Sequence, residues 1–495
     1  MVSKTKSPTL SKSRFLAGLQ CPLRLWHQCH NPNLASEISP VQQAIFHMGH
    51  EVGELATRLY PRGVLVEEDH LHHEEAVETT LAAMKDLEVK AIYEAALLFN
   101  DVRIRVDILE KLGNGKWNLI EVKSSTSVKE VHLPDVAIQH HVLTGAGLDI
   151  DRVFLMHLNN RYIYDGSHLE LEKLFSASDM TRKVLVYENQ IFSLLSDFKD
   201  MLAKPREPGI RPGRHCRNPY ECEFREYCTE EMPEHWIMEL TGITQRRLNE
   251  MMAMEIQDIR DIPDSFPLTQ IQDRIRRCVV YDEEYISGEL RDELMDAEYP
   301  IHFLDFETVS PAIPRYARTR PYQTIPFQWS DHILYEDGTV EHKEWLCEED
   351  KDSREEFAIT LLRAMGDEGA IFIYTDYEKR IVHDLAGYLP QQRNPLQNLS
   401  GRFKDLQKLI RKYYYHPEFH GSFSLKFVLP ALVPEMDYKN LAIQEGSFAT
   451  LEYLRILEPS TSPQEKEEIE RNLLEYCRYD TLAMLKIREE ILKKI

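Results

Sequence analysis

The sequence of 495 residues lacks any run of about 18 apolar residues, the length that a membrane-spanning helix requires. Its first twelve residues are basic and polar and no apolar segment follows them, so we expect no secretory signal. Internal repeats and low-complexity tracts are also absent. These absences predict a cytoplasmic globular protein that has no membrane partner.

The sequence also lacks an excess of basic residues, because 59 lysines and arginines stand against 82 aspartates and glutamates, for a net charge of −23. A protein that coats nucleic acid is basic overall, so this charge counts against that class. A local basic groove on an acidic body remains compatible with a protein that acts on nucleic acid.

Length and composition predict an α/β protein of several domains. A chain of 495 residues is too long for one ordinary core, and its 43% hydrophobic and 28% charged residues are those of a globular protein. Residues 1–230 have the patterns of a mixed α/β domain, and residues 296–495 return to them. Residues 231–295 show short amphipathic helical patterns and no strand pattern, which predicts a helical linker or a small helical hairpin able to hold a DNA backbone.

Hydrophobic periodicity predicts individual elements in both α/β parts. The turn Gly113-Asn114-Gly115 joins two predicted strands into a hairpin. The predicted helices span residues 11–23, 41–60, 135–144, 406–415 and 466–494, and the predicted strands span residues 96–108, 117–122, 153–157, 301–306, 327–334 and 370–374.

A first group of polar residues belongs to this hairpin. Asp107 lies near the end of one strand, and Glu121 and Lys123 lie on one face of the next because side chains alternate along a strand. Such residues at a sheet edge can bind one or two magnesium ions, and the lysine can orient water and stabilise a phosphorane charge. An exposed Glu/Lys pair on a surface hairpin is the alternative interpretation.

Two predicted helices add candidates to this group. His50 and Glu54 are four residues apart, hence on one helical face, and are candidate additional metal ligands. Gln139, on the helix that follows the hairpin, is a candidate to position phosphate or water.

Four cysteines bracket the first group. Cys21 precedes it, and Cys216, Cys222 and Cys228 follow it with five residues between consecutive cysteines. In a reducing cytosol such cysteines are thiols or metal ligands rather than disulfides.

The order of helical His/Glu, strand Asp, strand Glu-x-Lys and helical Gln resembles the RecB-like branch of the PD-(D/E)XK nucleases. One cysteine before this core and three after it resembles the iron–sulfur members of that branch, which include helicase-associated and CRISPR-associated nucleases. The resemblance implies that Cys21, Cys216, Cys222 and Cys228 hold a [4Fe–4S] cluster that staples the ends of the nuclease fold. Zinc, which thiolates also bind, and plain buried cysteines are the alternatives.

A second group of acids lies in the C-terminal part. The apolar strand at residues 301–306 ends in Asp305-Phe306-Glu307, and alternation places both carboxylates on one face. Two carboxylates so close repel each other unless a cation is bound. Tyr476 and Asp480 are four residues apart and share a helical face.

This order of Asp-x-Glu, mid-chain acid and late Tyr-x-x-x-Asp resembles the DnaQ-like exonucleases of the RNase H-like fold. The resemblance implies that Tyr476 orients the attacking water while four acids hold two magnesium or manganese ions. The implied ligands are Asp305, Glu307, Glu378 and Asp480, with Asp376 and Asp405 as alternatives to Glu378.

Together the resemblances cover most of the chain, and the whole resembles a bacterial family of uncharacterised role. That family joins an iron–sulfur RecB-like nuclease, with a restriction-endonuclease-like fold, to a C-terminal RNase H-like region. The resemblance implies a metal-dependent nuclease that hydrolyses DNA, mainly from single-stranded ends, in repair or phage defence. Two alternatives stay open: a nucleic-acid-binding scaffold with a degenerate exonuclease domain and structural zinc, and an RNA exonuclease that works only through the C-terminal site.

Overall fold

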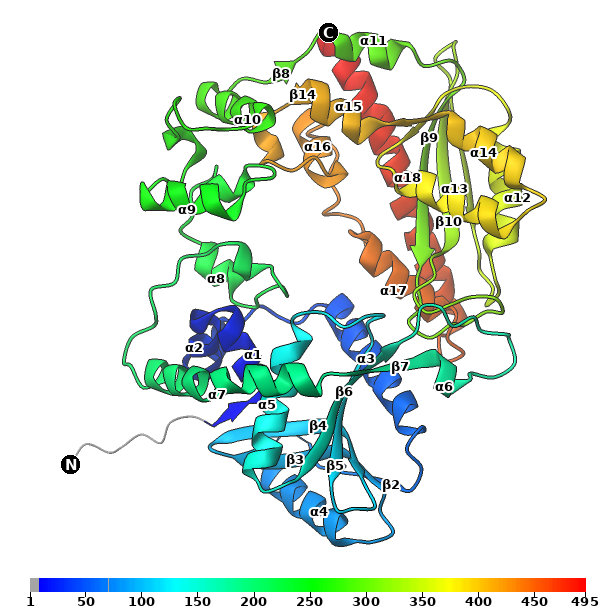
Figure 1. Cartoon of the computed structure of the whole chain (residues 1–495). Helices are drawn as coiled ribbons and strands as arrows, with labels where there is room; N and C mark the ends of the chain where they lie inside the picture. The colour runs from blue at the N-terminus through cyan, green and yellow to red at the C-terminus, as the bar shows by residue number, and fades with distance from the viewer. Residues whose placement is uncertain (1–8, 70) are drawn as a thin grey trace. The chain divides into compact units, whose positions relative to one another are not determined.

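The computed structural model describes residues 9–69 and 71–495, which form two compact units (Figure 1). Unit 1 comprises the described residues up to Glu231 together with Pro311–Gln323, and unit 2 comprises Met232–Ser310 and Thr324–Ile495. Residues 1–8, which carry most of the expectation about a secretory signal, lie outside the described part. None of the described helices combines the length and apolar character that crossing a bilayer takes.

Unit 1 is built on a seven-stranded mixed sheet in the order β2-β3-β4-β5-β6-β7, with β1 paired to β4. Strands β3, β4 and β5 are antiparallel neighbours, β6 runs parallel to β5, and β7 is antiparallel to β6. The strands are β1 (Leu10–Ser11), β2 (Gly63–Leu65), β3 (Ala91–Phe99), β4 (Val102–Lys111), β5 (Trp117–Lys123), β6 (Ile150–Leu158) and β7 (Phe175–Asp179).

The helices of unit 1 pack an apolar core against this sheet, with Leu119 of β5 and Val136 and Leu143 of α5 among its fully buried residues. Helix α3 begins in a capping box in which the Ser39 and Gln42 side chains each bond the other's backbone N–H. The helices are α1 (Lys12–Gln20), α2 (Pro22–His30), α3 (Pro40–Thr57), α4 (His73–Lys85), α5 (His132–Gly145), α6 (Leu171–Leu174), α7 (Thr181–Leu202) and α8 (Arg225–Thr229).

Two predicted elements of unit 1 differ from the structure. The single strand predicted at 96–108 is wrong, because β3 and β4 meet there in a tight turn at Asn100 and Asp101, both with left-handed φ values of 51° and 59°. Asn and Asp tolerate this conformation, so two polar residues suffice to reverse the chain. The helix predicted at 11–23 is interrupted at Cys21, whose backbone is extended between α1 and α2.

Unit 2 contains a five-stranded sheet in the order β11-β10-β9-β12-β13 and a two-stranded sheet of β14 and β8. Strands β11, β10 and β9 are antiparallel neighbours, and β12 and β13 continue parallel to β9. The strands are β8 (Tyr285–Ile286), β9 (Ile301–Val309), β10 (Ile325–Leu334), β11 (Val340–Leu346), β12 (Ile371–Ile373), β13 (Phe403–Asp405) and β14 (Tyr414–Tyr415).

The faces of the five-stranded sheet carry different helices. Leu304 and Phe306 of β9 pack with α12, α13 and α14 in one apolar core. Asp305 and Glu307 alternate with them and therefore face the other side, where α17 and α18 contact β9. The helices of unit 2 are α9 (Gln245–Ala253), α10 (Gln270–Tyr281), α11 (Glu289–Met295), α12 (Arg354–Met365), α13 (Tyr377–Tyr388), α14 (Arg393–Gly401), α15 (Leu406–Tyr413), α16 (Leu425–Leu432), α17 (Gly446–Ile456) and α18 (Pro463–Lys494).

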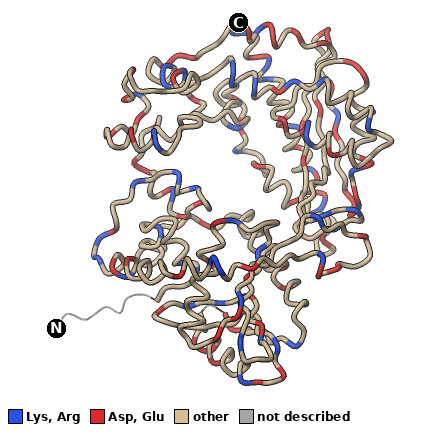
Figure 2. Tube along the Cα trace, viewed as in Figure 1, with Lys and Arg blue, Asp and Glu red and all other residues tan. Residues whose placement is uncertain are grey.

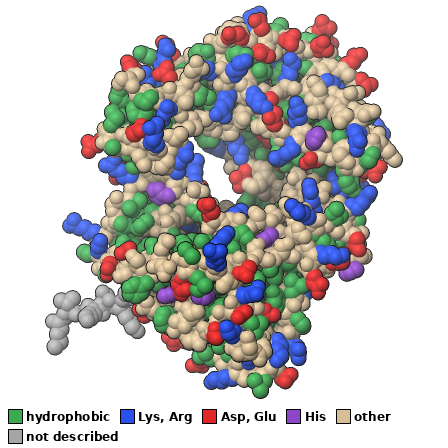
Figure 3. All heavy atoms as spheres, in the orientation of Figure 1, with side chains coloured by type: hydrophobic (Ala, Val, Ile, Leu, Met, Phe, Trp, Pro, Cys, Tyr) green, Lys and Arg blue, Asp and Glu red, His purple; other side chains and the backbone are tan. Residues whose placement is uncertain are grey.

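Charged residues are distributed along both units. Figure 2 shows lysine and arginine interspersed with aspartate and glutamate along the trace, and Figure 3 shows the same mixture on the visible face. The net charge of −23 is therefore not confined to one segment.

Candidate functional site

The acids of unit 2 converge on one cavity of about 610 Å³. Asp305 and Glu307 come from β9 and Asp480 from α18, and one carboxylate oxygen of each lies within 4.8 Å of the others. Glu378, near the start of α13, is buried and lines the same cavity. The structure thus brings together the four acids that the sequence predicts for the second group, the one in the C-terminal part.

These acids hold protons more tightly than ordinary carboxyl groups. Burial and the neighbouring Asp480 raise the pKa values of Asp305 and Glu307 well above their ordinary range. Burial also raises the pKa of Glu378 to about 8 and that of Asp480 to about 6. A divalent cation that binds here must displace these protons, so its affinity increases with pH.

The two alternative acids lie outside the cavity lining. Asp376 is exposed and forms an ion pair with Lys408. Asp405 caps α15 by accepting a hydrogen bond from the backbone N–H of Lys408 at 2.7 Å. Glu378 is therefore the mid-chain acid that faces the other three.

Three further side chains line the cavity beside the acids. Tyr476 lies one helical turn before Asp480, in the place that the sequence predicts for it. The Tyr438 hydroxyl donates a hydrogen bond to Asp480 Oδ1. The positive charge of Lys426 offsets part of the rise that burial causes in the pKa values of Glu307 and Asp480. Tyr438 could not be found from the sequence because it is 42 residues from its partner and no spacing marks it.

In unit 1, Asp107, Glu121 and Lys123 line a second cavity, of about 1260 Å³. The pairing of β4 with β5 ends at Ile108 and Ile120. Asp107, which precedes Ile108 in the chain, and Glu121, which follows Ile120, are the next residues beyond that last pair. Asp107 Oδ2 accepts a hydrogen bond from the backbone N–H of Val122 at 2.6 Å. Burial and Glu121 raise the pKa of Asp107 to about 7.

Two lysines bind two carboxylates in this cavity. Lys123 Nζ lies 2.6 Å from both Glu121 Oε1 and Asp135 Oδ2. Lys12 Nζ lies 2.8 Å from Glu121 Oε1 and 3.3 Å from Asp135 Oδ1. Burial alone would lower the pKa of each lysine, but the two carboxylates outweigh it and raise the pKa values.

Gln139 joins this network from α5. Its Nε2 donates to Glu121 Oε2 at 2.7 Å and to Asp135 Oδ1 at 3.0 Å, and its Oε1 is buried with no hydrogen-bond partner. Asp135 was missed from the sequence, although its spacing of four residues before Gln139 could have indicated it. Lys12 was missed because it is 109 residues from Glu121.

His50 and Glu54 lie on α3 and line the same cavity, with exposed side chains. Among the described residues, however, neither forms a group with Asp107 and Glu121 in which the potential ligand atoms lie within 4.8 Å of one another. The structure brings them to the cavity but not to the two strand acids.

Glu94 is a further acid of this cavity that the sequence does not single out. It lies in the middle of β3 with a left-handed φ of 55°, and its carboxylate accepts a hydrogen bond from Arg105 Nε at 3.1 Å. A left-handed non-glycine residue inside a strand is strained, and such residues gather at functional sites.

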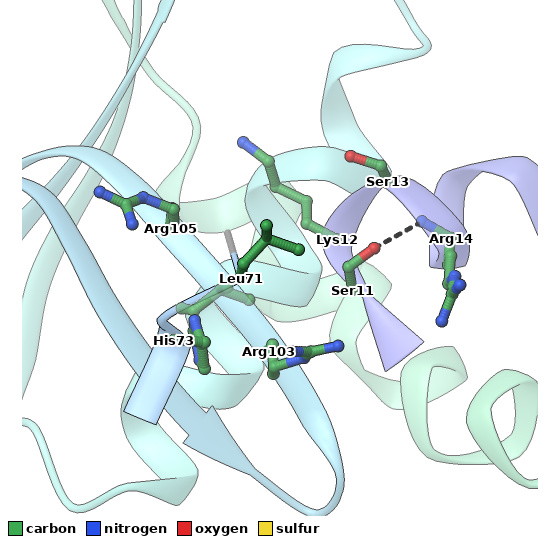
Figure 4. Close-up of a pocket in the computed structure, with 9 residues that line it drawn as sticks. Ser11, Lys12, Ser13, Arg14, Leu71, His73, Arg103 and Arg105 are labelled. Carbon is green, nitrogen blue, oxygen red and sulfur yellow. Dashed lines mark hydrogen bonds between the residues drawn. The ribbon is translucent and has the colours of Figure 1, made fainter. Parts of the chain in front are cut away.

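A basic pocket of about 570 Å³ lies next to the cavity of Asp107, Glu121 and Lys123 in unit 1, and Lys12 lines both. Figure 4 shows Lys12 and Arg14 on its α1 side and Arg103, Arg105 and His73 on its β4 and α4 side. No acidic residue is among its lining residues, all of which lie in the described part of the chain. This pocket is a local basic surface on an acidic body.

The four predicted cysteine ligands line one small cavity in unit 1. No three of their sulfur atoms lie within 4.8 Å of one another in the described chain. Burial raises the pKa of Cys222 to about 11, and burial together with the other three cysteines raises that of Cys228 to about 12. At neutral pH these cysteines are therefore thiols, and a metal that binds them must displace their protons.

Comparison with protein families gives a match, most of it in unit 2. The profile of a family described as "Domain of unknown function (DUF2779)" matches residues 302–424. The matched segment contains Asp305, Glu307 and Glu378 but not Tyr476 or Asp480. A search of curated proteins gave no match.

Proposed function

We propose that this protein is a metal-dependent nuclease that hydrolyses phosphodiester bonds of DNA, mainly from single-stranded ends, in repair or phage defence. The observation that carries the proposal is the meeting of Asp305, Glu307 and Asp480 within 4.8 Å, with Glu378 on the same cavity. Acids held this close in a buried position cannot all ionise unless cations bind, and paired divalent metals are the usual agents of phosphodiester hydrolysis.

The strand arrangements support the two folds in this proposal. In unit 2, three antiparallel strands are followed by two parallel ones with β9 in the centre, as expected for an RNase H-like domain. In unit 1, three antiparallel strands, a helix and a parallel strand follow in order, as expected for a restriction-endonuclease-like domain.

The side chains of unit 2 fit defined roles. The four acids would hold two magnesium or manganese ions, which supply charge stabilisation and lower the pKa of bound water. Tyr476 lines the cavity beside Asp480 and would orient the water. Lys426 lies near enough to lower the pKa values of Glu307 and Asp480, and it would hold a phosphate oxygen.

In unit 1, Asp107 and Glu121 would hold the metal, and Lys123 would stabilise the charge that develops on the phosphate. Gln139 holds the Glu121 carboxylate through its Nε2 and so fixes the direction of that ligand. The basic pocket of Lys12, Arg14, Arg103 and Arg105 offers a path for the phosphate backbone next to this site.

The four cysteines that line one cavity would hold a [4Fe–4S] cluster, in which each thiolate binds a different iron. Zinc, which thiolates also bind, is the alternative. When bound, the cluster would tie Cys21 to the segment of residues 216–228.

A second candidate function is that only unit 2 cleaves, with RNA as its substrate, while unit 1 binds nucleic acid as a scaffold. One observation favours it: Lys12 and Lys123 already neutralise Glu121 and Asp135, so these acids need no metal for charge balance. Comparison of end-labelled DNA and RNA as substrates distinguishes the two candidates.

The test is cleavage of end-labelled single-stranded DNA with manganese by protein purified without oxygen. In a Lys123→Ala background, which silences the site of unit 1, we expect Asp305→Asn to lower the cleavage rate by at least a hundredfold, while Asp384→Asn, at an exposed position of α13, leaves it unchanged. Metal-independent cleavage, or equal rates in both variants, would overturn the proposal.

A further inference from the structure

Three side chains of unit 2, separate from the acids described above, meet around one point. His235 and Glu239 belong to the segment that contains the 3-10 helix Ile237–Glu239, and His420 follows the 3-10 helix Pro417–Phe419. One potential ligand atom from each lies within 4.8 Å of the others. Two segments almost two hundred residues apart in the sequence thus supply an imidazole–carboxylate–imidazole set.

The set contains buried polar atoms that the protein leaves without hydrogen bonds. His235 is only 9% exposed, and its Nδ1 has no partner. Glu239 Oε2 is also buried without a hydrogen bond, and His420 Nδ1 lies 3.6 Å from it. A buried polar atom without a partner destabilises the fold, so two such atoms in one set of potential ligands indicate a missing ligand.

The backbone holds the two segments together around this set. The Thr241 hydroxyl donates a hydrogen bond to the carbonyl of Gly421. A Cβ at Gly421 would lie 1.6 Å from the carbonyl oxygen of Glu239, so only glycine permits this approach. His420 itself has a left-handed φ of 45°, a strained conformation that such packing can maintain.

The charges around the set favour a cation. Glu418 Oε2 lies 3.8 Å from His420 Nε2 on the outer side. The nearby Asp258 is held by Arg260, with Nη2 of the arginine 2.6 Å from Asp258 Oδ2, so this arginine does not neutralise Glu239.

We propose that His235, Glu239 and His420 bind a zinc ion that clips residues 235–241 to the loop at residues 416–421. Two imidazoles and one carboxylate are a common ligand set of Zn²⁺, with a water molecule in the fourth position. The side chains of His420 and Glu239 remain 28% and 25% exposed, which leaves access for that water. The site shares no residue with the four acids or the cysteine cavity, and it does not rest on the proposed nuclease activity.

The test compares metal content and the spectrum of the Co²⁺-substituted protein in wild type and variants. Cobalt bound to imidazole and carboxylate gives visible d–d bands, whereas cobalt at the cysteines adds intense thiolate charge-transfer bands, so the two sites are separable. Glu239→Gln preserves shape, and His420→Asn places a residue that tolerates the left-handed backbone. His383→Ala, at an exposed histidine of α13, is the matched control.

We expect wild type and the His383 variant to bind one more zinc equivalent than either site variant, and to show d–d bands that both site variants lack. Zinc should raise the melting temperature of wild type after chelation, and this increase should be smaller in the two site variants. Equal zinc content and identical cobalt spectra in all four proteins would overturn the proposal, and so would a wild type without the d–d bands.

Discussion

At the residue scale, Glu378 links the stability of the metal-free protein to pH. Its pKa is about 8 in the folded protein against an ordinary value of 4.5, so between these values the folded state binds more protons than the unfolded state. Stability therefore falls as pH rises from about 4.5 to about 8. Glu378→Gln should flatten this fall, measured as melting temperature against pH in the presence of a chelator.

The matched control is Glu368→Gln, at an exposed position of unit 2. Its stability should follow the wild-type pH dependence. If Glu378→Gln and the control gave the same curve of melting temperature against pH, the inference that Glu378 is protonated in the folded state up to about pH 8 would be wrong. Saturating manganese should reduce the pH dependence of wild type, because the metal displaces the proton.

Lys426 gives a prediction that separates phosphate binding from metal binding. Its positive charge partly offsets the rise in the pKa values of Glu307 and Asp480, and it repels a cation while attracting a phosphate. In a Lys123→Ala background, Lys426→Gln should lower the cleavage rate roughly ten- to hundredfold without weakening manganese binding. Lys439→Gln, at a side chain that is 88% exposed, should change neither.

For Lys426→Gln, the manganese concentration that gives half the maximal rate is the deciding measurement. A higher concentration than in wild type would show that Lys426 supports the metal site rather than the substrate.

The residues that sequence reasoning found and missed differ in their separation along the chain. Glu121 and Lys123 are two residues apart on one strand, and Tyr476 and Asp480 are four apart on one helix, so local geometry places each pair on one face. Lys12 and Tyr438 reach their partners only through the tertiary fold. Whether the predicted residues catalyse hydrolysis stays a prediction that the variants above test.

At the element scale, α18 determines the geometry of the acid cavity in unit 2 because it carries Tyr476 and Asp480 against the sheet. Buried hydrogen bonds hold it there, since Thr481 Oγ1 lies 2.8 Å from His332 Nδ1 and 3.0 Å from Ser330 Oγ, both on β10. Thr481→Val keeps the shape but leaves these partners unsatisfied. It should lower the free energy of unfolding by about 1–3 kcal/mol in urea titrations.

Gln464→Ala, in the exposed first turn of the same helix, should change that free energy by less than about 0.5 kcal/mol. A Thr481 variant as stable as this control would mean that the buried hydrogen bonds do not hold α18 on β10.

Elements with a clear period were predictable, and elements defined by a turn were not. The strand of residues 117–122 and the helices near residues 41–60 and 466–494 appear as β5, α3 and α18, with ends shifted by a few residues. The turn at Asn100 and Asp101 was missed because apolar alternation continues on both sides of it. Strand β11 was missed because its residues are mostly polar and only partly buried or exposed.

At the scale of the whole molecule, the cysteine cavity brings Cys21, between the N-terminal helices α1 and α2, together with the segment of residues 216–228. Protein purified without oxygen should be brown, and Cys216→Ser should remove the visible absorption and destabilise the protein. Cys29→Ser, at a half-buried cysteine of the same unit, should keep the colour. A colourless wild type that contains zinc would contradict the cluster.

The division of the chain into two units makes the contributions of the two sites separable. The sequence predicted an α/β protein, which the structure confirms, because alternating and helical patterns are local properties. It could not give the strand order of either sheet, because pairings such as β9 with β12 join residues far apart in the chain.

The most direct measurement of the central claim is the cleavage rate of end-labelled single-stranded DNA by the double variant that combines Lys123→Ala with Asp305→Asn. This rate is compared with that of each single variant. The control is Lys85→Ala, at an exposed position of α4. All variants are first shown to be folded by their circular dichroism and melting temperatures. If both units are metal-dependent nucleases, each single variant retains part of the wild-type activity, the double variant retains none, and Lys85→Ala retains all. Undiminished cleavage by the folded double variant would contradict the account.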